Sequence, residues 1–355
     1  MILVQFGDLH LDQPLENLSP ERARAQRENS RKLLFQIIDL ANRENADAII
    51  CTGDLFDSEK PYLDSCIFAA KAFGKTDIPV FIAPGNHDPY SPSSPYEAVD
   101  WPANVHIFTS SAPQTLTFPA FRITGWANTE HRSSLRPLEG FRTEKKADIP
   151  EILVFHGEIA SDSPYFSADG AQIAASQADY LALGHIHGAF QKKFGSCLAV
   201  MNGGVEATRR GETGEKGVIL ANIGPEGAKA KLIPLGGCRA FEAELEDRGE
   251  ETVFSELLRL CPHPPENTMV TLTLLGDVIS DKNRLFELAG EFLSFKLTDR
   301  RKPEKHSRSG KSLAALFAKR AEEEELSALA LEFGLCALEN REQPSKDTNK
   351  QKNSL

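Results

Sequence analysis

The feature that most constrains this chain is a series of short apolar runs, most of them followed closely by glycine, aspartate, asparagine or histidine. Such runs, rich in branched residues and bounded by Gly, Pro, Asn or Asp, are typical of buried strands. They read ILVQF, DAIICT, IPVFIAP, FRITGWA, EILVFH, DYLALG, CLAVMN and GVILANI. Helix-like segments at 30–42 and 62–73 separate the first of them. The alternation predicts an α/β fold with a parallel sheet, and the later runs predict a mixed sheet or a second sheet.

The pattern changes near residue 237, where the strand series ends. From 241 to 297 the pattern reads strand, helix, strand (MVTLTLLG) and helix (NRLFELAGEF), which predicts a small α+β domain. Two short amphipathic helices follow a basic stretch, and Gly334 is expected to end one of them. The predicted regions are a large domain (1–236), the α+β domain (237–299), a basic linker (300–311), C-terminal helices (312–340) and a disordered tail (341–355).

Composition narrows the class of protein. A net charge of −11 disfavours a broadly basic DNA-coating protein, although bound divalent cations would reverse the sign locally. The six cysteines form no CxxC pair, which predicts reduced thiols rather than a disulfide framework. No apolar run is long enough to span a membrane, and the N-terminus shows no secretory signal pattern. We therefore expect a cytoplasmic protein without membrane association.

Five polar motifs, GDLH, GDLFD, GNHD, FHGE and GHIH, sit where apolar runs end. In an extended backbone residues i and i+2 point to the same side, so Asp8 and His10 form one pair and His185 and His187 another. The ends of neighbouring strands in an open α/β fold meet at one rim, which is where such folds place their sites. We expect the motif glycines to allow close backbone approach there; they are Gly7, Gly53, Gly85 and Gly184.

The chemistry of these motifs favours metal binding. A mixture of carboxylate, imidazole and one amide oxygen suits manganese, iron or zinc better than a thiolate-preferring metal. The motifs offer seven candidate ligands, which are too many for one ion and suit two ions that share a bridging carboxylate. The seven are Asp8, His10, Asp54, Asn86, His156, His185 and His187. Two ions about 3.5–4 Å apart can activate a water molecule and orient a phosphate. We expect two divalent metal ions, with Mn²⁺ favoured and Fe, Zn or Mg as alternatives.

The ordered motifs D-x-H, GDxxD, GNHD, H and GHxH resemble the calcineurin-like metallophosphoesterase superfamily over residues 1–223. The resemblance implies a two-sheet αββα sandwich. It also implies that each metal has three ligands of its own and that Asp54 bridges the two metals. The implied ligands are Asp8, His10 and His187 for one metal, and Asn86, His156 and His185 for the other.

The same resemblance implies catalytic roles for two more residues. His87 would stabilise the transition state or protonate the leaving oxygen, and Asp57 would orient the His87 imidazole. A carboxylate partner would raise the pKa of that imidazole and fix its tautomer. Asp88 is a candidate for a supporting role behind the ligands.

The sequences of the segments GDLFD, DYLALGHIH and NGGVEATRRGETGEKGV resemble one branch of the superfamily, the SbcD-like and YhaO-like DNA-repair exonucleases. That resemblance implies that residues 237–299 form a capping domain that holds DNA over the metals. It also implies that the C-terminal helices dock onto an SMC-like coiled-coil ATPase. Packing of those helices onto the chain's own body is the alternative, and a homodimer remains open.

Basic residues give a weaker indication of the substrate. Arg209 and Arg210 follow the Gly203–Gly204 turn downstream of GHIH, so they are the better candidates for binding substrate phosphate. An arginine pair without any phosphate role is the alternative. Basic residues on the first helix are expected to form a solvated face.

We therefore expect a two-metal phosphodiesterase, a DNA-repair exonuclease or endonuclease that hydrolyses backbone phosphodiesters with a metal-activated water. One alternative is a small-molecule or nucleotide phosphodiesterase or phosphatase. Another is a DNA-end-binding adaptor for an SMC-like ATPase. Cleavage polarity and strand preference stay open at this point, because no motif reports on them.

Overall fold

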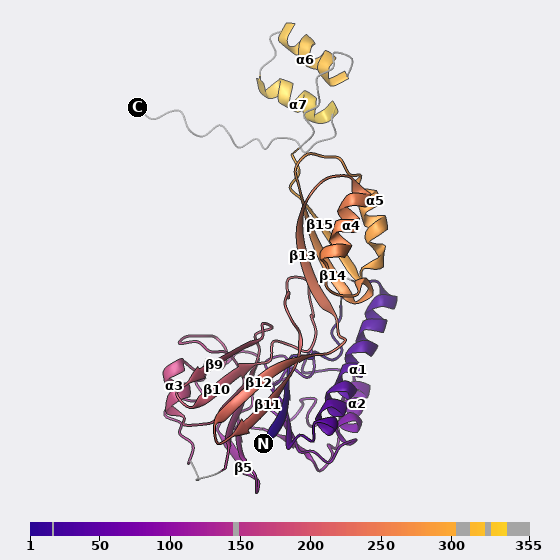
Figure 1. Ribbon diagram of the computed structural model, residues 1–355. Coiled ribbons are helices and arrows are strands. Elements are labelled where there is room, and N and C mark those ends of the chain that lie inside the picture. The colour runs from indigo at the N-terminus through magenta and orange to yellow at the C-terminus, as the bar shows by residue number, and fades with distance from the viewer. Residues whose placement is uncertain (16–17, 145–148, 303–312, 324–327, 339–355) are drawn as a thin grey trace, which may run out of the picture. The chain divides into compact units, whose positions relative to one another are not determined.

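The computed structural model describes residues 1–15, 18–144, 149–302, 313–323 and 328–338. The chain divides into two compact units, residues 1–300 and residues 301–355. The colours of Figure 1 follow the chain through its elements, from indigo at the N-terminus to yellow in the second unit. Within the described residues, no helix is both long enough and apolar enough to cross a bilayer.

Two six-stranded sheets form most of the first unit. The first contains β1 (Ile2–Phe6), β2 (Ala48–Cys51), β3 (Val80–Ile82), β4 (Val105–Ile107), β11 (Gly217–Gly224) and β12 (Gly227–Pro234), in the order β12-β11-β1-β2-β3-β4. The second contains β5 (Gln114–Thr117), β6 (Arg122–Gly125), β7 (Glu151–His156), β8 (Tyr180–Gly184), β9 (Phe190–Phe194) and β10 (Cys197–Met201), in the order β5-β6-β7-β8-β10-β9. Strands β1 to β4 are parallel, and so are β6, β7, β8 and β10.

Alternating side chains stack these sheets into four layers. Val4 of β1 belongs to the core beneath the first two helices, whereas its neighbour Leu3 belongs to the core between the sheets. In β7, Val154 faces that central core, and Phe155 lies in the outer core on the other side. The flanking helices are α1 (Pro20–Arg43), α2 (Leu63–Phe73) and α3 (Gly170–Ala175). The predicted αββα sandwich is confirmed.

Helix α1 begins at Pro20, well before the predicted start at Ser30. The Ser19 hydroxyl accepts a hydrogen bond from the amide of Arg22, and proline at the first helical position has no amide hydrogen to leave unpaired. The first turns are mostly polar and bury few side chains. Hydrophobic periodicity therefore could not reveal them.

The rest of the first unit is a three-stranded subdomain, whose strands are all parallel. Its elements are β13 (Arg239–Glu246), α4 (Glu250–Leu260), η1 (Pro265–Asn267), β14 (Thr268–Leu275), α5 (Lys282–Leu288), η2 (Ala289–Glu291) and β15 (Ser294–Asp299). Both α-helices lie on the same face of the sheet (Figure 1), over a core that includes Leu272 and Phe292. Strand β15 extends the predicted strand–helix–strand–helix series. The boundary at 236/237 stays a prediction.

The described residues of the second unit form two helices, α6 (Leu313–Glu323) and α7 (Ala328–Leu338). Gly334 does not end a helix, so that expectation was wrong. A Cβ atom on Gly334 would lie 2.2 Å from the ring of Phe317, so the missing side chain lets α6 and α7 pack closely. The predicted disordered tail and residues 303–311 of the predicted linker lie outside the described residues.

Candidate metal centre

The structure gathers the predicted motifs at the carboxyl ends of five strands. They follow β1, β2 and β3 in the first sheet and β7 and β8 in the second. Parallel neighbours end on the same edge, and the stacking of the two sheets brings both edges to one place. The residues brought together are Asp8, His10, Asp54, Asp57, Asn86, His87, His156, His185 and His187.

Four of these residues have a left-handed backbone. The φ angles are 53° at Asp8, 46° at His10, 48° at Asp54 and 94° at His185. Non-glycine residues rarely adopt such angles, and strain of this kind gathers at functional sites. Main-chain bonds hold it in place, since the amide of Asp8 donates to the Gly53 carbonyl at 2.9 Å and that of His10 to the Asp54 carbonyl at 3.0 Å.

Glycines allow the loops to approach this closely. A Cβ atom on Gly85 would lie 2.1 Å from a carboxylate oxygen of Asp54. One on Gly53 would lie 2.7 Å from the His156 ring, and Gly53 also has a φ of +100°. The expectation that motif glycines permit close backbone approach is confirmed at both positions.

One group of candidate ligand atoms consists of Asp8, His10 and His187, and these atoms lie within 4.8 Å of one another. The Nε2 atoms of the two histidines face each other at 3.3 Å. His187 Nε2 also lies 3.6 Å from Asp8 Oδ1. Two imidazole nitrogens and a carboxylate oxygen thus point at one small volume, as a divalent ion requires.

A second group forms around Asn86. Its side-chain oxygen lies 2.9 Å from His156 Nε2 and 2.9 Å from His185 Nδ1. Asp54 lies between the two groups, with Oδ2 3.3 Å from His156 Nε2 and 3.8 Å from His10 Nε2. This is the place that a bridging carboxylate would occupy.

The electrostatics of the protein alone show how strongly this site attracts positive charge. Burial by itself would lower the pKa of His10 and of His156, but nearby carboxylates outweigh it and raise both pKa values to about 9. Burial would raise the pKa of Asp54, yet the charges of His156 and His10 lower it. Without metal, protons on imidazoles therefore balance the carboxylates, and metal binding would have to release them.

The resemblance implied that the Asp57 carboxylate orients His87, but the structure shows a different contact. Asp57 Oδ1 instead lies 3.0 Å from His10 Nδ1, behind the ligand atom of that imidazole. The main-chain carbonyl of Asp57 accepts from His87 Nδ1 at 3.0 Å. The loop after β2 turns the side chain toward β1, so carboxylate and carbonyl serve different histidines.

Asp88 supports the loops from within. Its buried carboxylate accepts hydrogen bonds from the amides of Gly85, Phe56 and Asp54, and from the hydroxyl of Tyr96 at 2.6 Å. Burial first, and then the charge of Asp54, raises its pKa to about 6. Asp88 thereby ties the GDLFD loop to the GNHD loop.

Sequence reasoning missed Asn202. It follows β10, beside β8, and its Nδ2 lies 3.4 Å from Asp8 Oδ2 while also donating to the Gly7 carbonyl. The signal was present, because a polar residue directly after CLAVM obeys the same strand-end rule as the other motifs. It was overlooked because an isolated asparagine makes no recognisable motif.

Both candidate phosphate-binding arginines contact protein groups. Arg209 Nε donates to Glu212 at 2.8 Å, although the Arg209 side chain is 72% exposed. Arg210 donates to the hydroxyl of Ser294 in the three-stranded subdomain. Their role toward a substrate stays a prediction.

The model of the calcineurin-like phosphoesterase family matches residues 1–189. This chain belongs to that family. The family name, calcineurin-like phosphoesterase, describes hydrolases that act on phosphoesters. The matched region carries every motif gathered at the site.

The chain is also similar to individual proteins. An uncharacterized metallophosphoesterase, YhaO of Bacillus subtilis, is 30% identical over 236 residues, 63% of this chain and 57% of that protein. The DNA double-strand break repair protein Mre11 of Sulfurisphaera tokodaii is 26% identical over 193 residues, 52% of this chain and 48% of that protein. The chain thus spans about half the length of these relatives. A solved dimetal phosphatase from Danio rerio matches with 12% identity and a TM-score of 0.41, over 64% of this chain and 96% of that one.

The residues present fit the two metal ions that the family implies. The donors are carboxylate, imidazole and amide atoms, which suit borderline and hard divalent cations. Three overlapping groups of such donors lie within 4.8 Å, namely Asp8–His10–His187, His10–Asp54–His87 and Asp8–Asp54–His156. Family membership and these groups together indicate a site for two metals.

Proposed function

We propose that this phosphoesterase is a DNA nuclease of the repair type that uses Mn²⁺. The observation that carries the proposal is the three-stranded subdomain, which packs directly against the loop that follows Asp8 and His10. Leu18 of that loop contacts a cluster containing Met269 and Leu293 of the subdomain. A structure beside the metal centre can hold a long substrate, and the similarity to a protein named for DNA break repair supports the same class.

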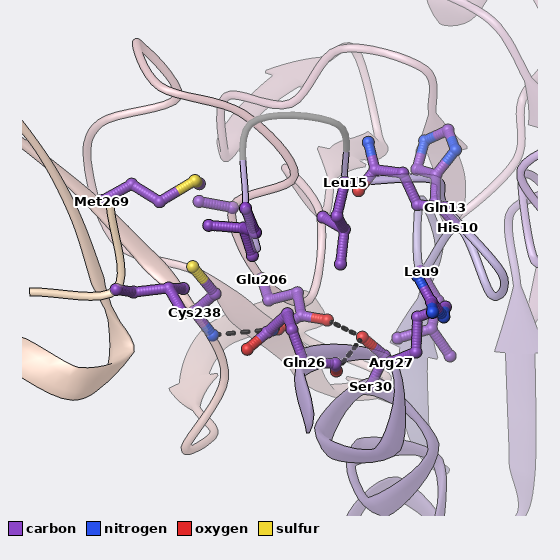
Figure 2. A pocket seen from close by; sticks show the side chains of 13 residues that line it. Leu9, His10, Gln13, Leu15, Gln26, Arg27, Ser30, Glu206, Cys238 and Met269 are labelled. Carbon is purple, nitrogen blue, oxygen red and sulfur yellow. Dashed lines mark hydrogen bonds between the residues drawn. The ribbon is translucent and has the colours of Figure 1, made fainter. Parts of the chain in front are cut away.

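Polar groups also hold together the region where the subdomain meets the rest of the unit. A small cavity of about 10 Å³ lies in this region. His10 and Gln13 line it at one side and Cys238 and Met269 at the other (Figure 2). Glu206 lines it and accepts hydrogen bonds from Ser30, from Gln26 at 2.6 Å and from the Cys238 amide at 2.9 Å. One buried carboxylate therefore joins α1, the loop after β10 and the beginning of the subdomain.

Bound metal ions would supply an activated water and neutralise charge on the phosphate. We propose that His87 serves the leaving oxygen. Its ring lies edge-on to His10 with 4.8 Å between ring centroids, and its exposure at the rim supports this role. Its Nδ1 donates to the Asp57 carbonyl, so in the protonated ring Nε2–H is available as a donor. That proton can pass to the sugar oxygen as the phosphodiester breaks.

The test is nuclease activity with Mn²⁺ on 5′- and 3′-labelled single- and double-stranded oligonucleotides. Progressive shortening of one labelled end would support the proposal and give the polarity of cleavage. The same preparation is assayed on bis(p-nitrophenyl) phosphate. Intact DNA beside rapid hydrolysis of this small diester would contradict the proposal and favour a small-molecule phosphodiesterase.

We also propose that the C-terminal helices bind an SMC-like coiled-coil ATPase. Leu316 on α6 is 55% exposed, although Phe317 beside it packs against Gly334. An exposed leucine on an amphipathic helix suits a coiled-coil partner. Loss of ATPase binding on Leu316→Glu, measured with a candidate partner, would support this role; binding at wild-type strength would contradict it.

A homodimer is proposed on separate grounds. Tyr62, Leu63 and Ile67 expose apolar surface at the first turns of α2, with Tyr62 71% exposed. Contiguous apolar side chains at a surface mark contact sites. Sedimentation of the wild-type chain as a dimer, and of Ile67→Glu as a monomer, would support it, whereas a monomeric wild type would contradict it.

A further inference from the structure

His187, a predicted ligand of the first metal, is held by a carboxylate that no motif assigned. Its Nδ1 lies 2.7 Å from Glu212 Oε1. The Glu212 side chain is only 9% exposed, so this contact is well shielded from water. A short contact between an imidazole and a buried carboxylate fixes both the tilt of the ring and its tautomer.

A second residue of the same segment holds the main chain of His187. Lys216 is completely buried, and its ammonium donates to the carbonyl of His187 and, at 2.9 Å, to that of Gly203. Glu212 and Lys216 thus grip one residue at its ring and at its backbone. We call this pair, Glu212 and Lys216, the His187 clamp.

Glu212 is itself fixed in place. It accepts hydrogen bonds from the amide of Thr208 at 2.8 Å, from the Thr208 hydroxyl at 2.9 Å and from Arg209 Nε at 2.8 Å. Each carboxylate oxygen has a partner besides His187. The clamp can therefore impose an orientation on the imidazole instead of following it.

The orientation it imposes is the one a metal needs. With Nδ1 on Glu212, the remaining nitrogen Nε2 faces His10 Nε2 at 3.3 Å and Asp8 at 3.6 Å. His10 shows the same arrangement, since its Nδ1 lies on the Asp57 carboxylate. In the second group the Nδ1 of His156 contacts a main-chain carbonyl, that of Thr52. Carboxylates thus support both imidazoles of the Asp8–His10–His187 group.

We propose that Glu212 is a positioning residue that raises the metal affinity of the Asp8–His10–His187 group by holding His187 Nε2 toward the ion. The inference rests on the metal-dependent function proposed above. Removing the carboxylate partner of a ligand histidine typically weakens metal binding about 10- to 100-fold. The loss should fall on one of the two metals, because Glu212 contacts His187 and none of the second group's ligands appears among its hydrogen-bond partners in the described residues.

The experiment is calorimetric titration of Mn²⁺ into the metal-free full-length chain, with bound metal counted by elemental analysis. Glu212→Ala should weaken one of two Mn²⁺ sites about 10- to 100-fold, and Glu212→Gln, which keeps an acceptor oxygen, should weaken it less. One control should bind as the wild type does. Glu215→Ala removes an exposed carboxylate of the same segment.

Three outcomes decide the matter. Equal binding of two Mn²⁺ by Glu212→Ala and wild type would overturn the inference and leave the proposed function standing. Equal losses in Glu215→Ala and Glu212→Ala would also overturn it, because the order of the segment and not the imidazole contact would then matter. A wild-type chain that binds no Mn²⁺ would overturn the proposed function and this inference together. If Glu212→Ala fails to fold, Glu212→Gln carries the same comparison.

Discussion

Gly85 shows how one missing side chain shapes the site. Its hypothetical Cβ would lie 2.1 Å from Asp54 Oδ1 and 2.4 Å from the Asp54 amide nitrogen, so a methyl group must displace the predicted bridging carboxylate. We expect Gly85→Ala to lower phosphodiester hydrolysis at least about 100-fold, because small misplacements of a catalytic group cost that much. Bis(p-nitrophenyl) phosphate assays would measure it. Gly236→Ala, at a position with no atom near its Cβ, is the control, and equal activity of both variants would contradict the argument.

His87 gives a second prediction at this scale. In His87→Ala the carboxylates and imidazoles of the two ligand groups remain, so bound metal should persist while hydrolysis falls about 10²- to 10⁴-fold, the usual contribution of a general acid. Metal counting and turnover on the same sample test both halves. Loss of metal together with activity would show that His87 acts as a ligand, as its place near His10 and Asp54 also allows.

The limits of sequence reasoning are also clearest at single residues. Strand ends located Asp8, His10, His185 and His187, because parallel neighbours end at one rim of a sheet. The i, i+2 rule does not explain how these pairs point, since Asp8, His10 and His185 have left-handed φ angles and not an extended backbone. The partner of Asp57 could not be found that way. Its carboxylate meets His10 across 47 positions of sequence, and the turn of an irregular loop decides which histidine it reaches.

At the scale of elements, the strands that the sequence analysis missed in the two large sheets are β4, β5, β9 and β12, which are their four edges, and the missed β15 is an edge of the three-stranded sheet. Interior strands are buried on both faces and read as continuous apolar runs. Edge strands are not: β9 is FQKKF and almost wholly exposed, and β12 alternates partly buried with exposed residues. Lysines on such edges also discourage pairing with other chains. The missing signal therefore reflects the position of these strands.

Helix α1 supplies a prediction about the subdomain. The guanidinium of Arg22 donates to the carbonyls of Phe292 at 2.9 Å, Leu293 at 3.0 Å and Gly290 at 2.7 Å. Arg22 is exposed, as expected for this basic helix face, and it also contacts the subdomain. Arg22→Ala should increase amide hydrogen exchange over residues 290–294 and lower DNA cleavage several-fold, while small-diester hydrolysis stays within about twofold. Arg24→Ala on the same helix is the control.

The DNA-cleavage and small-diester assays together distinguish an effect on the subdomain from an effect on the metal centre. A parallel loss of both activities in Arg22→Ala would show that the contact supports the metal centre itself. Unchanged hydrogen exchange would show that the three carbonyl contacts do not hold the subdomain. Either result would contradict a role for α1 in joining subdomain and site.

For the whole molecule, the metal centre links folding to pH. His10 and His156 are fully buried, and neighbouring carboxylates overcome the effect of burial and raise both pKa values from 6.5 to about 9. A raised pKa stabilises the folded state fully below the unfolded value and loses that effect as pH rises through the folded value. The metal-free chain should therefore lose stability between pH 6.5 and pH 9.5, by on the order of 3 kcal/mol for either histidine.

Metal should reverse this trend, because ligand imidazoles must give up their protons to bind an ion and do so more readily as pH rises. Thermal unfolding at pH 6.5, 8 and 9.5, with EDTA and with Mn²⁺, measures both slopes, and the stabilisation by Mn²⁺ should grow with pH. Metal-free His156→Asn should show a flatter profile than the wild type. A wild-type profile that stays level in EDTA would mean that these imidazoles are neutral in the metal-free protein, and that its carboxylates are balanced by some other charge.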